Sequence, residues 1–274
     1  MTLLIAWIGA DTHGTSSIYL SADSRISWGD GTQFDLGRKV FAFNHWPDIL
    51  GYCGDVMFPA IALSQIVDLA DAGLLFQPAF SCKQKFQAIV DKLNDLFRQY
   101  PHQNKSITAD GLTVVHASRD PEDNHKFFCH EITWKRDVGW SGTECRLPDS
   151  SRVLFSLGSG ASEFAENYGR YEVGPNRDTS RAVFHCFCDT LAKTSMASVG
   201  GAPQVVGIYR KPNSPAFALG VIYGGKRYFL GAHIDNVARH QAIEWRNINF
   251  ERCDGRTMEL IRHAQPQPDP LRRL

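Results

Sequence analysis

The chain begins with residue types that can perform nucleophilic chemistry. Thr2 follows the initiator Met1, and removal of a methionine ahead of a small residue is ordinary chain processing. The processed chain would carry a hydroxyl and a free α-amine on one residue. A threonine hydroxyl is a weak nucleophile until a base takes its proton. An α-amine has a reference pKa of roughly 7.7–8.0, so part of it is unprotonated near neutral pH. Thr2 therefore combines a nucleophile with a base.

Three charged residues further along the chain can support this chemistry. Asp23 and Arg25 end the second apolar run, and Lys39 opens the third. A lysine ammonium near Thr2 would favour the unprotonated amine and an ionising hydroxyl. Asp23 would hold Lys39, and Arg25, on the same face of a strand, would balance the Asp23 carboxylate. Taken singly, each has a structural interpretation: a surface-facing threonine at a strand start, an ion pair and a solvated lysine.

Hydrophobic periodicity predicts the elements that position these residues. We expect a first hairpin from strands 2–8 and 18–24, joined by turn residues 9–16. A second hairpin follows from strands 39–43 and 49–53. Helices are expected over residues 58–72, 83–100, 161–168 and 179–197. Further strands are expected over residues 112–117, 126–134, 152–157, 204–209, 217–223 and 227–230. The order is strands, two helices, strands, two helices, strands, which predicts two sheets between two helical layers.

Composition indicates one large domain with an extension. The chain has 274 residues, of which 43% are hydrophobic, and this is ample for a packed core. We expect the domain over residues 1–235 and a partly flexible C-terminal extension over residues 236–274. The end of the chain is polar and proline-containing, and we expect the tail beyond His263 to be mobile.

Three segments resemble the proteasome β-subunit family. Segment 21–25, Ser-Ala-Asp-Ser-Arg, is followed fourteen residues after its arginine by Lys39. That family has an N-terminal threonine, an Ala-Asp-x-Arg segment and a catalytic lysine at this spacing. Segment 51–55, Gly-Tyr-Cys-Gly-Asp, resembles the family's glycine after the fourth strand, and segment 157–161 resembles its Gly-Ser-Gly turn. Over residues 2–230 the chain is similar to a divergent bacterial member, of the ancestral β-subunit type, of these N-terminal nucleophile (Ntn) hydrolases.

The resemblance implies both a fold and a set of roles. The fold would be α+β, a four-layer αββα sandwich. Thr2 would be the nucleophile and, through its amine, the base; Lys39 would tune it and Asp23 would orient Lys39. Ser159 would steady the amine or a water molecule. The Gly54 amide would face the developing oxyanion, where one donor is typically worth about 3–4 kcal/mol. The reaction would be hydrolysis of an amide bond through an acyl ester, without a cofactor.

The resemblance also implies partners. The substrate would be a peptide or protein, and the subunits would form a homo-oligomeric ring that sequesters the nucleophile. The sequence has no phosphate-binding loop motif, so ATP-driven unfolding would need a separate ATPase. Lys plus Arg and Asp plus Glu each number 29, which implies no nucleic-acid surface. We expect a cytoplasmic protein with no membrane segment, free thiols and no metal, since His185, Cys186 and Cys188 fan over different helix faces.

The chain departs from the family pattern near a glycine pair. The family has an Asp and a Ser just before this pair, whereas Met196 and Val199 stand in those places here. Ser198 would substitute for the serine after a shift of one residue. The first hairpin also has extra turn residues between Thr2 and Asp23. Two alternatives therefore stay open: a catalytically silent scaffold or binding subunit, and an amidase acting on small amides.

Overall fold

The structure is a computed structural model that describes residues 2–101, 111–135, 138–238 and 242–262. Its helices are α1 (Met57–Asp71), α2 (Cys82–Gln99), α3 (Ala161–Tyr171) and α4 (Ser180–Lys193). All four were expected from the sequence. Helix α4 ends four residues before the expected end, because the following residue, Thr194, turns to an extended conformation with a ψ of 136°. None of the helices in these ranges has the length and apolarity needed to span a lipid bilayer.

The larger sheet has nine strands in the order β10-β1-β2-β11-β12-β13-β14, with β15 paired to β12 and β16 to β15. Its strands are β1 (Leu4–Asp11), β2 (Gly14–Ala22), β10 (Arg152–Leu157), β11 (Gln204–Tyr209), β12 (Phe217–Tyr223), β13 (Lys226–Phe229), β14 (Ala232–His233), β15 (Trp245–Arg246) and β16 (Arg252–Cys253). Among the strands of the described residues, only the β12–β15 pairing is parallel. The larger sheet therefore gathers both ends of the described chain.

The second sheet has five antiparallel strands in sequence order. They are β5 (Val40–Ala42), β6 (Asp48–Cys53), β7 (Leu112–Arg119), β8 (Phe127–Lys135) and β9 (Gly139–Glu144). A separate two-stranded sheet pairs β3 (Ile26–Ser27) with β4 (Gln33–Phe34). The sequence did not predict β3, β4, β9 or the two-residue strands β14, β15 and β16. Strand β9 contains two glycines and is mostly exposed at a sheet edge, so it carries no alternating apolar pattern.

The first hairpin differs from the prediction. Strand β1 runs to Asp11 and β2 starts at Gly14, so most of the expected turn over residues 9–16 is paired strand. The register shifts between Gly9 and Ala10, where a bulge interrupts the ladder. The residues expected as turn therefore lengthen the two strands, and the turn itself is short. Residues 9–16 are small or polar, so they lack the apolar pattern from which a strand is predicted.

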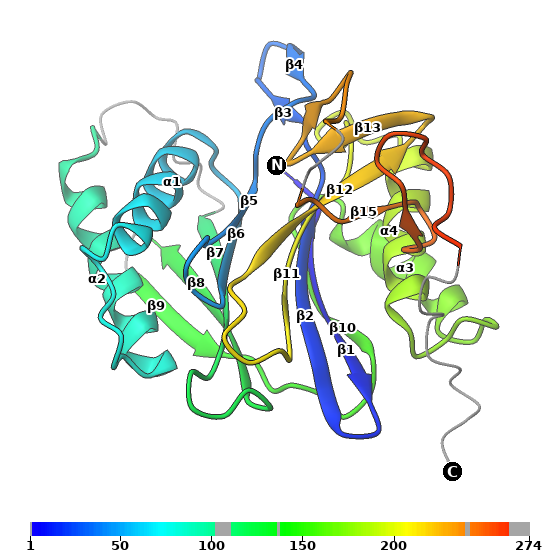
Figure 1. The fold of residues 1–274 in the computed structure, drawn as a ribbon. Helices are drawn as coiled ribbons and strands as arrows, with labels where there is room; N and C mark the ends of the chain where they lie inside the picture. The colour runs from blue at the N-terminus through cyan, green and yellow to red at the C-terminus, as the bar shows by residue number, and fades with distance from the viewer. Residues whose placement is uncertain (1, 102–110, 136–137, 239–241, 263–274) are drawn as a thin grey trace.

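Three apolar clusters hold these elements together. One packs α3 and α4 against the large sheet, and includes Trp7 and Phe184. Another packs α1 and α2 against the five-stranded sheet. The third joins side chains of both sheets, such as Leu20 and Val115. In Figure 1, α1 and α2 lie on one side of the molecule beside the five-stranded sheet, and α3 and α4 lie on the other. The fold is thus α+β, with helices covering two large antiparallel sheets.

Strand β1 has two buried faces. Ile5 and Trp7 belong to the cluster beneath α3 and α4, whereas Leu4 and Ala6 belong to the cluster between the sheets. A strand buried on both faces needs an unbroken apolar run. This requirement explains the apolar sequence that follows Thr2, and it fixes the start of the chain inside the molecule.

Part of the expected C-terminal extension packs on the large sheet. Trp245 on β15 pairs with Gly220 on β12 and is 2% exposed. A Cβ on Gly220 would lie 2.4 Å from the Trp245 ring, so only glycine admits this contact. The tail beyond His263, which we expected to be mobile, lies outside the described residues.

Candidate active site

Thr2 lies at the entrance of β1 and is fully buried. Its carbonyl oxygen accepts a hydrogen bond from the Gly160 amide at 3.4 Å. Gly158 has a φ of +90°, and a Cβ there would lie 2.0 Å from the Thr2 carbonyl oxygen. The prediction of a surface-facing Thr2 was wrong, because the turn over residues 158–160 closes on its backbone. Ser159 stands between the two glycines that contact Thr2.

Asp23 joins the start of β1 to Lys39. The Lys39 ammonium donates to Asp23 Oδ1 at 2.8 Å, and both side chains have no exposed surface. The same oxygen accepts the Leu3 amide at 3.0 Å. The ammonium group is therefore tied, through one carboxylate oxygen, to the peptide bond that follows Thr2. The expected pairing of Asp23 with Lys39 is present, and the interpretation of Lys39 as a solvated lysine is wrong.

The second carboxylate oxygen of Asp23 also accepts two hydrogen bonds. Oδ2 accepts the Arg25 amide at 3.2 Å and the Gly200 amide at 3.1 Å. Three backbone amides and one ammonium thus converge on a single carboxylate. The Gly200 carbonyl in turn accepts the Ser24 and Arg25 amides at 3.1 and 3.0 Å. The glycine pair at 200–201 is therefore closed onto the Asp23–Arg25 segment.

Burial and the Asp23 carboxylate shift the pKa of Lys39 in opposite directions. Burial lowers the pKa of Lys39 below its usual value, and the attraction of the Asp23 carboxylate only partly opposes this. A buried ammonium is costly unless it is paired and hydrogen-bonded. The pair is therefore held by its surroundings, and Lys39 is an easier proton donor than a solvated lysine.

Gln204 is a supporting residue that sequence reasoning missed. Its side-chain oxygen accepts the Lys39 amide at 3.0 Å. Its side-chain nitrogen donates to the carbonyls of Asp23 at 3.1 Å and Gly37 at 2.7 Å. Gln204 is fully buried at the first position of β11. A glutamine opening an apolar strand was the available signal, because a buried amide must find partners.

The Arg25 side chain forms its ion pair with Asp35 and not with Asp23. Its guanidinium forms a two-bond ion pair with Asp35, at 2.7 Å from Nε and 2.9 Å from Nη2. Hydrogen bonding from Arg25 lowers the pKa of Asp35. Only the backbone amide of Arg25 reaches Asp23. The expected side-chain pair between Asp23 and Arg25 was wrong, because Asp35 was not recognised as the partner.

Ser159 meets Ser198 across the turn. The two hydroxyl oxygens lie 3.0 Å apart. Met196 is partly buried against the apolar cluster of α3 and α4, and Val199 is 1% exposed within it. Met196 and Val199, where the chain departs from the family pattern, therefore contribute to apolar packing. Ser198 places its hydroxyl beside that of Ser159.

Gly54 follows β6 in a conformation that favours glycine. Its φ is +103°, and a Cβ would lie 2.6 Å from the Gly111 carbonyl oxygen. Glycine is the residue that adopts such a backbone at low cost. A side chain at position 54 would therefore clash with the Gly111 backbone and require an unfavourable φ.

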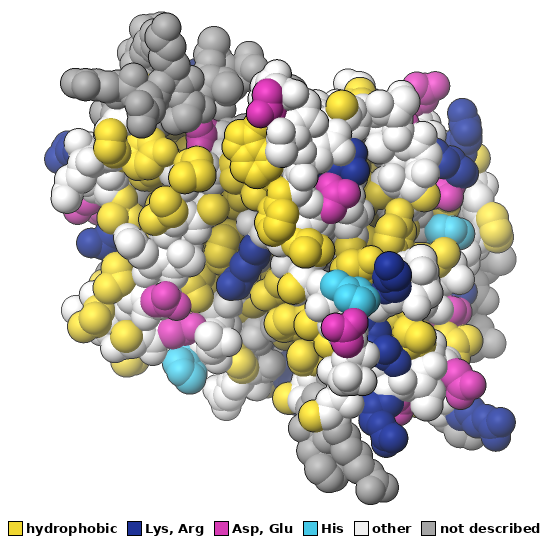
Figure 2. Space-filling view, turned by 90° about the horizontal axis from the view of Figure 1, so that it is seen from above, with side chains coloured by type: hydrophobic (Ala, Val, Ile, Leu, Met, Phe, Trp, Pro, Cys, Tyr) yellow, Lys and Arg dark blue, Asp and Glu magenta, His cyan; other side chains and the backbone are white. Residues whose placement is uncertain are grey.

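A cavity lies beside the Asp23–Arg25 segment. It has a volume of about 420 Å³ and is lined in part by Arg25, Asp35, Gly200 and Tyr228. Strands β3 and β4 lie at the same end of the molecule, which Figure 2 shows from above. Exposed apolar residues of this segment are Trp28, Phe34 and Leu36. In the part of the chain that the structure describes, no group of His, Cys, Asp and Glu side chains is arranged to hold a metal ion.

Comparison with known proteins gives the fold. No protein-family model matches the sequence, and no curated protein matches it. Among solved structures, Anbu (ancestral beta-subunit) from Yersinia bercovieri is similar at 11% identity, with a TM-score of 0.55 over 79% of this chain and 86% of that chain. The Anbu (Gly-1) mutant from Hyphomicrobium sp. strain MC1 is 13% identical, with a TM-score of 0.52 over 85% and 89%.

A third similar structure is BPH from Thiobacillus denitrificans. It is 14% identical, with a TM-score of 0.50 over 77% of this chain and 100% of that chain. At these identities the likeness concerns the fold alone. The resemblance is confirmed at that level: the chain has the fold of the Anbu structures.

Proposed function

We propose that the chain is an N-terminal threonine hydrolase that cleaves amide bonds in peptides. The observation that carries the proposal is the buried Asp23 carboxylate, whose Oδ1 binds both the Leu3 amide at 3.0 Å and the Lys39 ammonium at 2.8 Å. This arrangement ties a buried cation to the residue that follows Thr2. A structural ion pair alone would not require a link to the start of the chain.

The proposed reaction starts after Met1 is removed. Thr2 is fully buried in the structure, and the proposal requires that removal of Met1 lets substrate reach it. The Thr2 hydroxyl then gives its proton to its own α-amine, directly or through water, and attacks the carbonyl carbon of the substrate. Lys39 favours the neutral amine and the ionising hydroxyl.

The second half of the reaction returns the nucleophile. Attack forms a tetrahedral intermediate whose oxyanion we assign to the Gly54 amide. The C–N bond breaks, the leaving amine takes the proton held by the Thr2 amine, and an ester forms on Thr2. Water then attacks the ester, the bond to the Thr2 oxygen breaks, the acyl group leaves as a carboxylic acid and the hydroxyl is restored. Ser159 and Ser198, 3.0 Å apart, would hold the Thr2 amine or the attacking water.

We infer the remaining organisation from the fold. The helices and the two sheets would form a four-layer αββα sandwich, with residues 1–235 as the Ntn domain and residues 236–274 as its extension. The active assembly would be a cytoplasmic homo-oligomeric ring that sequesters Thr2, supplied with unfolded protein by a separate ATPase. The three apolar clusters support the layer order.

A second candidate function is a catalytically silent subunit that keeps the fold as a scaffold. The observation that favours it is the apolar packing of Met196 and Val199, which leaves no carboxylate at the place where the family has one. Intact mass of the purified protein separates the two functions. Retained Met1 would favour the silent subunit, whereas a mass that begins at Thr2 is required for the hydrolase.

The decisive experiment is covalent labelling followed by cleavage assays. An epoxyketone or β-lactone probe should modify Thr2, and peptide mapping should locate the adduct there. Thr2→Ala should lose peptide hydrolysis by about 10³-fold or more, whereas Thr2→Ser keeps a hydroxyl and should retain measurable activity. Unaltered hydrolysis by Thr2→Ala would refute the assignment. Cleavage of simple amides but not of fluorogenic peptides would replace the peptidase with a small-amide amidase.

A further inference from the structure

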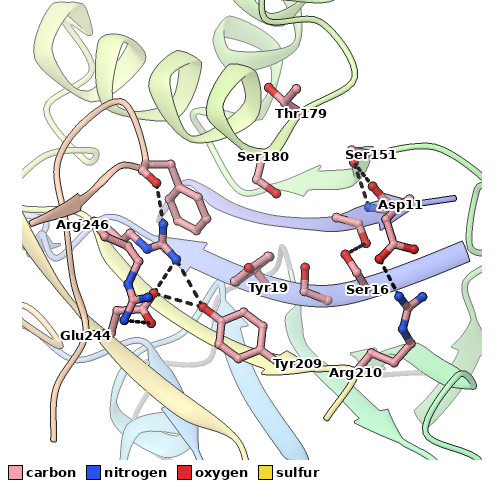
Figure 3. Close-up of a pocket in the computed structure, with 15 residues that line it drawn as sticks. Asp11, Ser16, Tyr19, Ser151, Thr179, Ser180, Tyr209, Arg210, Glu244 and Arg246 are labelled. Carbon is pink, nitrogen blue, oxygen red and sulfur yellow. Dashed lines mark hydrogen bonds and ion pairs between the residues drawn. The ribbon is translucent and has the colours of Figure 1, made fainter. Parts of the chain in front are cut away.

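A second cavity lies at the far end of β1 from Thr2 (Figure 3). Its volume is about 500 Å³. The floor is formed by the ends of β1 and β2, one wall by the first turn of α4, and the opposite wall by β11 and segment 244–252. Gly9 in this floor is seven residues along the strand from Thr2, or about 23 Å at ~3.3 Å per residue. The cavity is therefore separate from the candidate active site.

Serine hydroxyls surround the floor of this cavity. A Cβ on Gly9 would lie 2.5 Å from the Ser17 hydroxyl, 3.2 Å from that of Ser180 and 3.5 Å from that of Ser16. Glycine at position 9 therefore leaves open a space that three hydroxyls face. Figure 3 shows the Ser180 side chain directed from α4 into this space. The hydroxyl of Ser16 is occupied, since it donates to the Gly9 carbonyl at 3.0 Å.

Ser180 points to a ligand because its hydroxyl is unused. The residue is 8% exposed, and within the described ranges its side chain has no hydrogen-bond partner. The Ser180 hydroxyl oxygen is not among the fully buried polar atoms that lack a partner in the described residues, so it is open to the cavity. It is not needed to cap α4, since Thr179 already accepts the Ala182 amide at 3.3 Å. The hydroxyl is thus available to a molecule in the cavity.

The charges around the cavity favour an anion. Asp11 is paired with Arg210 at 2.5 Å, and Glu244 is shared by Arg246 and Arg252. The lining therefore has three guanidinium groups and two carboxylates, and each carboxylate is paired with at least one arginine. The side chains leave an excess of one positive charge. The N-terminus of α4, a helix of fourteen residues, adds partial positive charge from its first-turn amides.

Arg246 is fixed by its neighbours in this wall. It is 9% exposed, and it donates to the Phe250 carbonyl at 2.8 Å and to the Tyr209 hydroxyl at 3.4 Å. Its Nε has no partner among the described residues. A buried guanidinium held in this way is preorganised, so it loses little side-chain entropy when a ligand binds.

We propose that this cavity binds a phosphate group of a small phosphorylated molecule. The Ser180 hydroxyl and the first turn of α4 bind the phosphate oxygens, and the arginines of the opposite wall supply the countercharge. A phosphate ion alone would not fill about 500 Å³, a volume within the range of small-molecule sites. The organic part of the ligand would occupy the remaining space above Gly9. The site does not depend on the proposed hydrolase activity.

Calorimetric titration of the full chain tests the site. The probes are inorganic phosphate and glycerol 3-phosphate, with glycerol as the uncharged comparison and potassium chloride at equal ionic strength as the blank. We expect saturable binding of both phosphate compounds, with the monoester tighter. Ser180→Asp should raise the dissociation constant at least tenfold, because it places a carboxylate in the cavity while remaining favourable in a first helical turn. Ser180→Ala, which adds no charge, should raise it at least threefold.

Two control variants show whether the probes bind in this cavity. Ser162→Asp makes the same change at an exposed serine in the first turn of α3, and it should bind both phosphate compounds as the wild type does. Thr2→Ala should also bind them normally, so failure of the hydrolase proposal would leave this result unchanged. Binding no stronger than the chloride blank would overturn the proposal. So would wild-type affinity in both Ser180 variants, or tighter binding of glycerol than of either phosphate compound.

Discussion

At the scale of single residues, the candidate site is organised around the Asp23 carboxylate. Four donors converge on it: the Lys39 ammonium and the amides of Leu3, Arg25 and Gly200. If Lys39 is lost, Asp23 keeps its three amide bonds, but the buried carboxylate then lacks its cation, so the stability of the variant must be measured beside its activity.

Lys39→Ala should lower peptide hydrolysis by about 10²–10⁴-fold, the usual contribution of a group that assists proton transfer. Without the ammonium, the Thr2 amine and hydroxyl should titrate at higher pH, and the rising limb of the pH–rate profile should move to higher pH. The measurement is kcat/KM of the processed enzyme across pH. Lys126→Ala, at an exposed lysine, is the control. An unchanged pH–rate profile in Lys39→Ala would count against the role of Lys39.

The residues of the site were only partly predictable from the sequence. Asp23 ends one apolar run and Lys39 opens the next, and the family resemblance indicated that the two residues pair. The partner of Arg25 was not predictable, because Asp35 belongs to a short polar segment without strand periodicity. Gln204 also escaped prediction, since its three hydrogen bonds connect segments distant in sequence. The local sequence pattern indicates which residues are buried, whereas their hydrogen-bond and ion-pair partners depend on the tertiary fold.

At the scale of elements, the turn between β10 and α3 positions the start of the chain. Gly158 approaches the Thr2 carbonyl more closely than any side chain would allow, and Gly160 donates to the same oxygen. The turn therefore fixes the backbone of Thr2 while the Asp23 carboxylate fixes the amide of Leu3. Two elements from distant parts of the sequence hold the start of the chain at Thr2.

Gly158→Ala should destabilise the fold and displace Thr2. A non-glycine residue at a φ of +90° costs about 1–3 kcal/mol, and the clash with backbone 2.0 Å away adds to this because backbone cannot rotate aside. Urea unfolding measures the free-energy change. Gly169→Ala within α3 is the matched control, since a Cβ there meets nothing within 4 Å, and it should stabilise the helix by about 0.5–1 kcal/mol. Equal effects of the two substitutions would contradict a close approach of Gly158 to Thr2.

Element prediction succeeded where one face of an element is apolar. The helices over residues 58–72, 83–100 and 179–197 were predicted from their apolar residues, and the doubly buried β1 from its unbroken apolar run. It failed for β9, which is an exposed edge strand with two glycines, and for the β1–β2 turn, where Ser16 and Ser17 face the second cavity. Polar residues in that hairpin indicated a loop because the cavity that accommodates them was not visible in the sequence.

A buried ion pair joins α2 to the five-stranded sheet. Lys85 on α2 donates to Asp48 on β6 at 2.5 Å, and His116 on β7 contacts the other Asp48 oxygen at 2.9 Å. Burial opposes ionisation of Asp48, but attraction by Lys85 and hydrogen bonding to His116 outweigh it and lower the pKa of Asp48. The charge on Asp48 is therefore compensated only while α2 is docked.

Lys85→Met should reduce the free energy of unfolding by about 3–5 kcal/mol, because it leaves a buried carboxylate without its cation. Adding Asp48→Leu should recover part of this loss, since the unpaired charge is then removed as well. Chemical denaturation of the single and double variants measures both effects. Lys83→Met changes an exposed neighbour on α2 and should stay within about 0.5 kcal/mol of the wild type. A double variant less stable than Lys85→Met would show that the loss does not come from an unpaired carboxylate.

At the scale of the whole molecule, stability should fall in mild acid because one core histidine resists protonation. His130 on β8 is 9% exposed and stacks on Phe86 of α2 with ring centroids 4.2 Å apart. Burial, together with repulsion by His116, lowers the pKa of His130 from 6.5 to about 4. Nearby Lys85 and Asp48 form an internally compensated pair around His116, so they supply no free carboxylate that would stabilise a charged His130.

The sign of the pH dependence follows from proton binding. Below pH 6.5 the unfolded chain binds a proton at His130, whereas the folded chain does not until about pH 4. Stability from this group is therefore complete above pH 6.5 and is lost as the pH falls towards 4, with a slope of at most about 1.4 kcal/mol per pH unit. His130→Phe keeps the aromatic stack but cannot titrate, so its unfolding free energy should fall less steeply over this interval. His125→Phe, at an exposed histidine, should keep the wild-type slope. If chemical denaturation between pH 7 and 4 gives His130→Phe and the wild type the same slope, the acid sensitivity arises elsewhere in the fold.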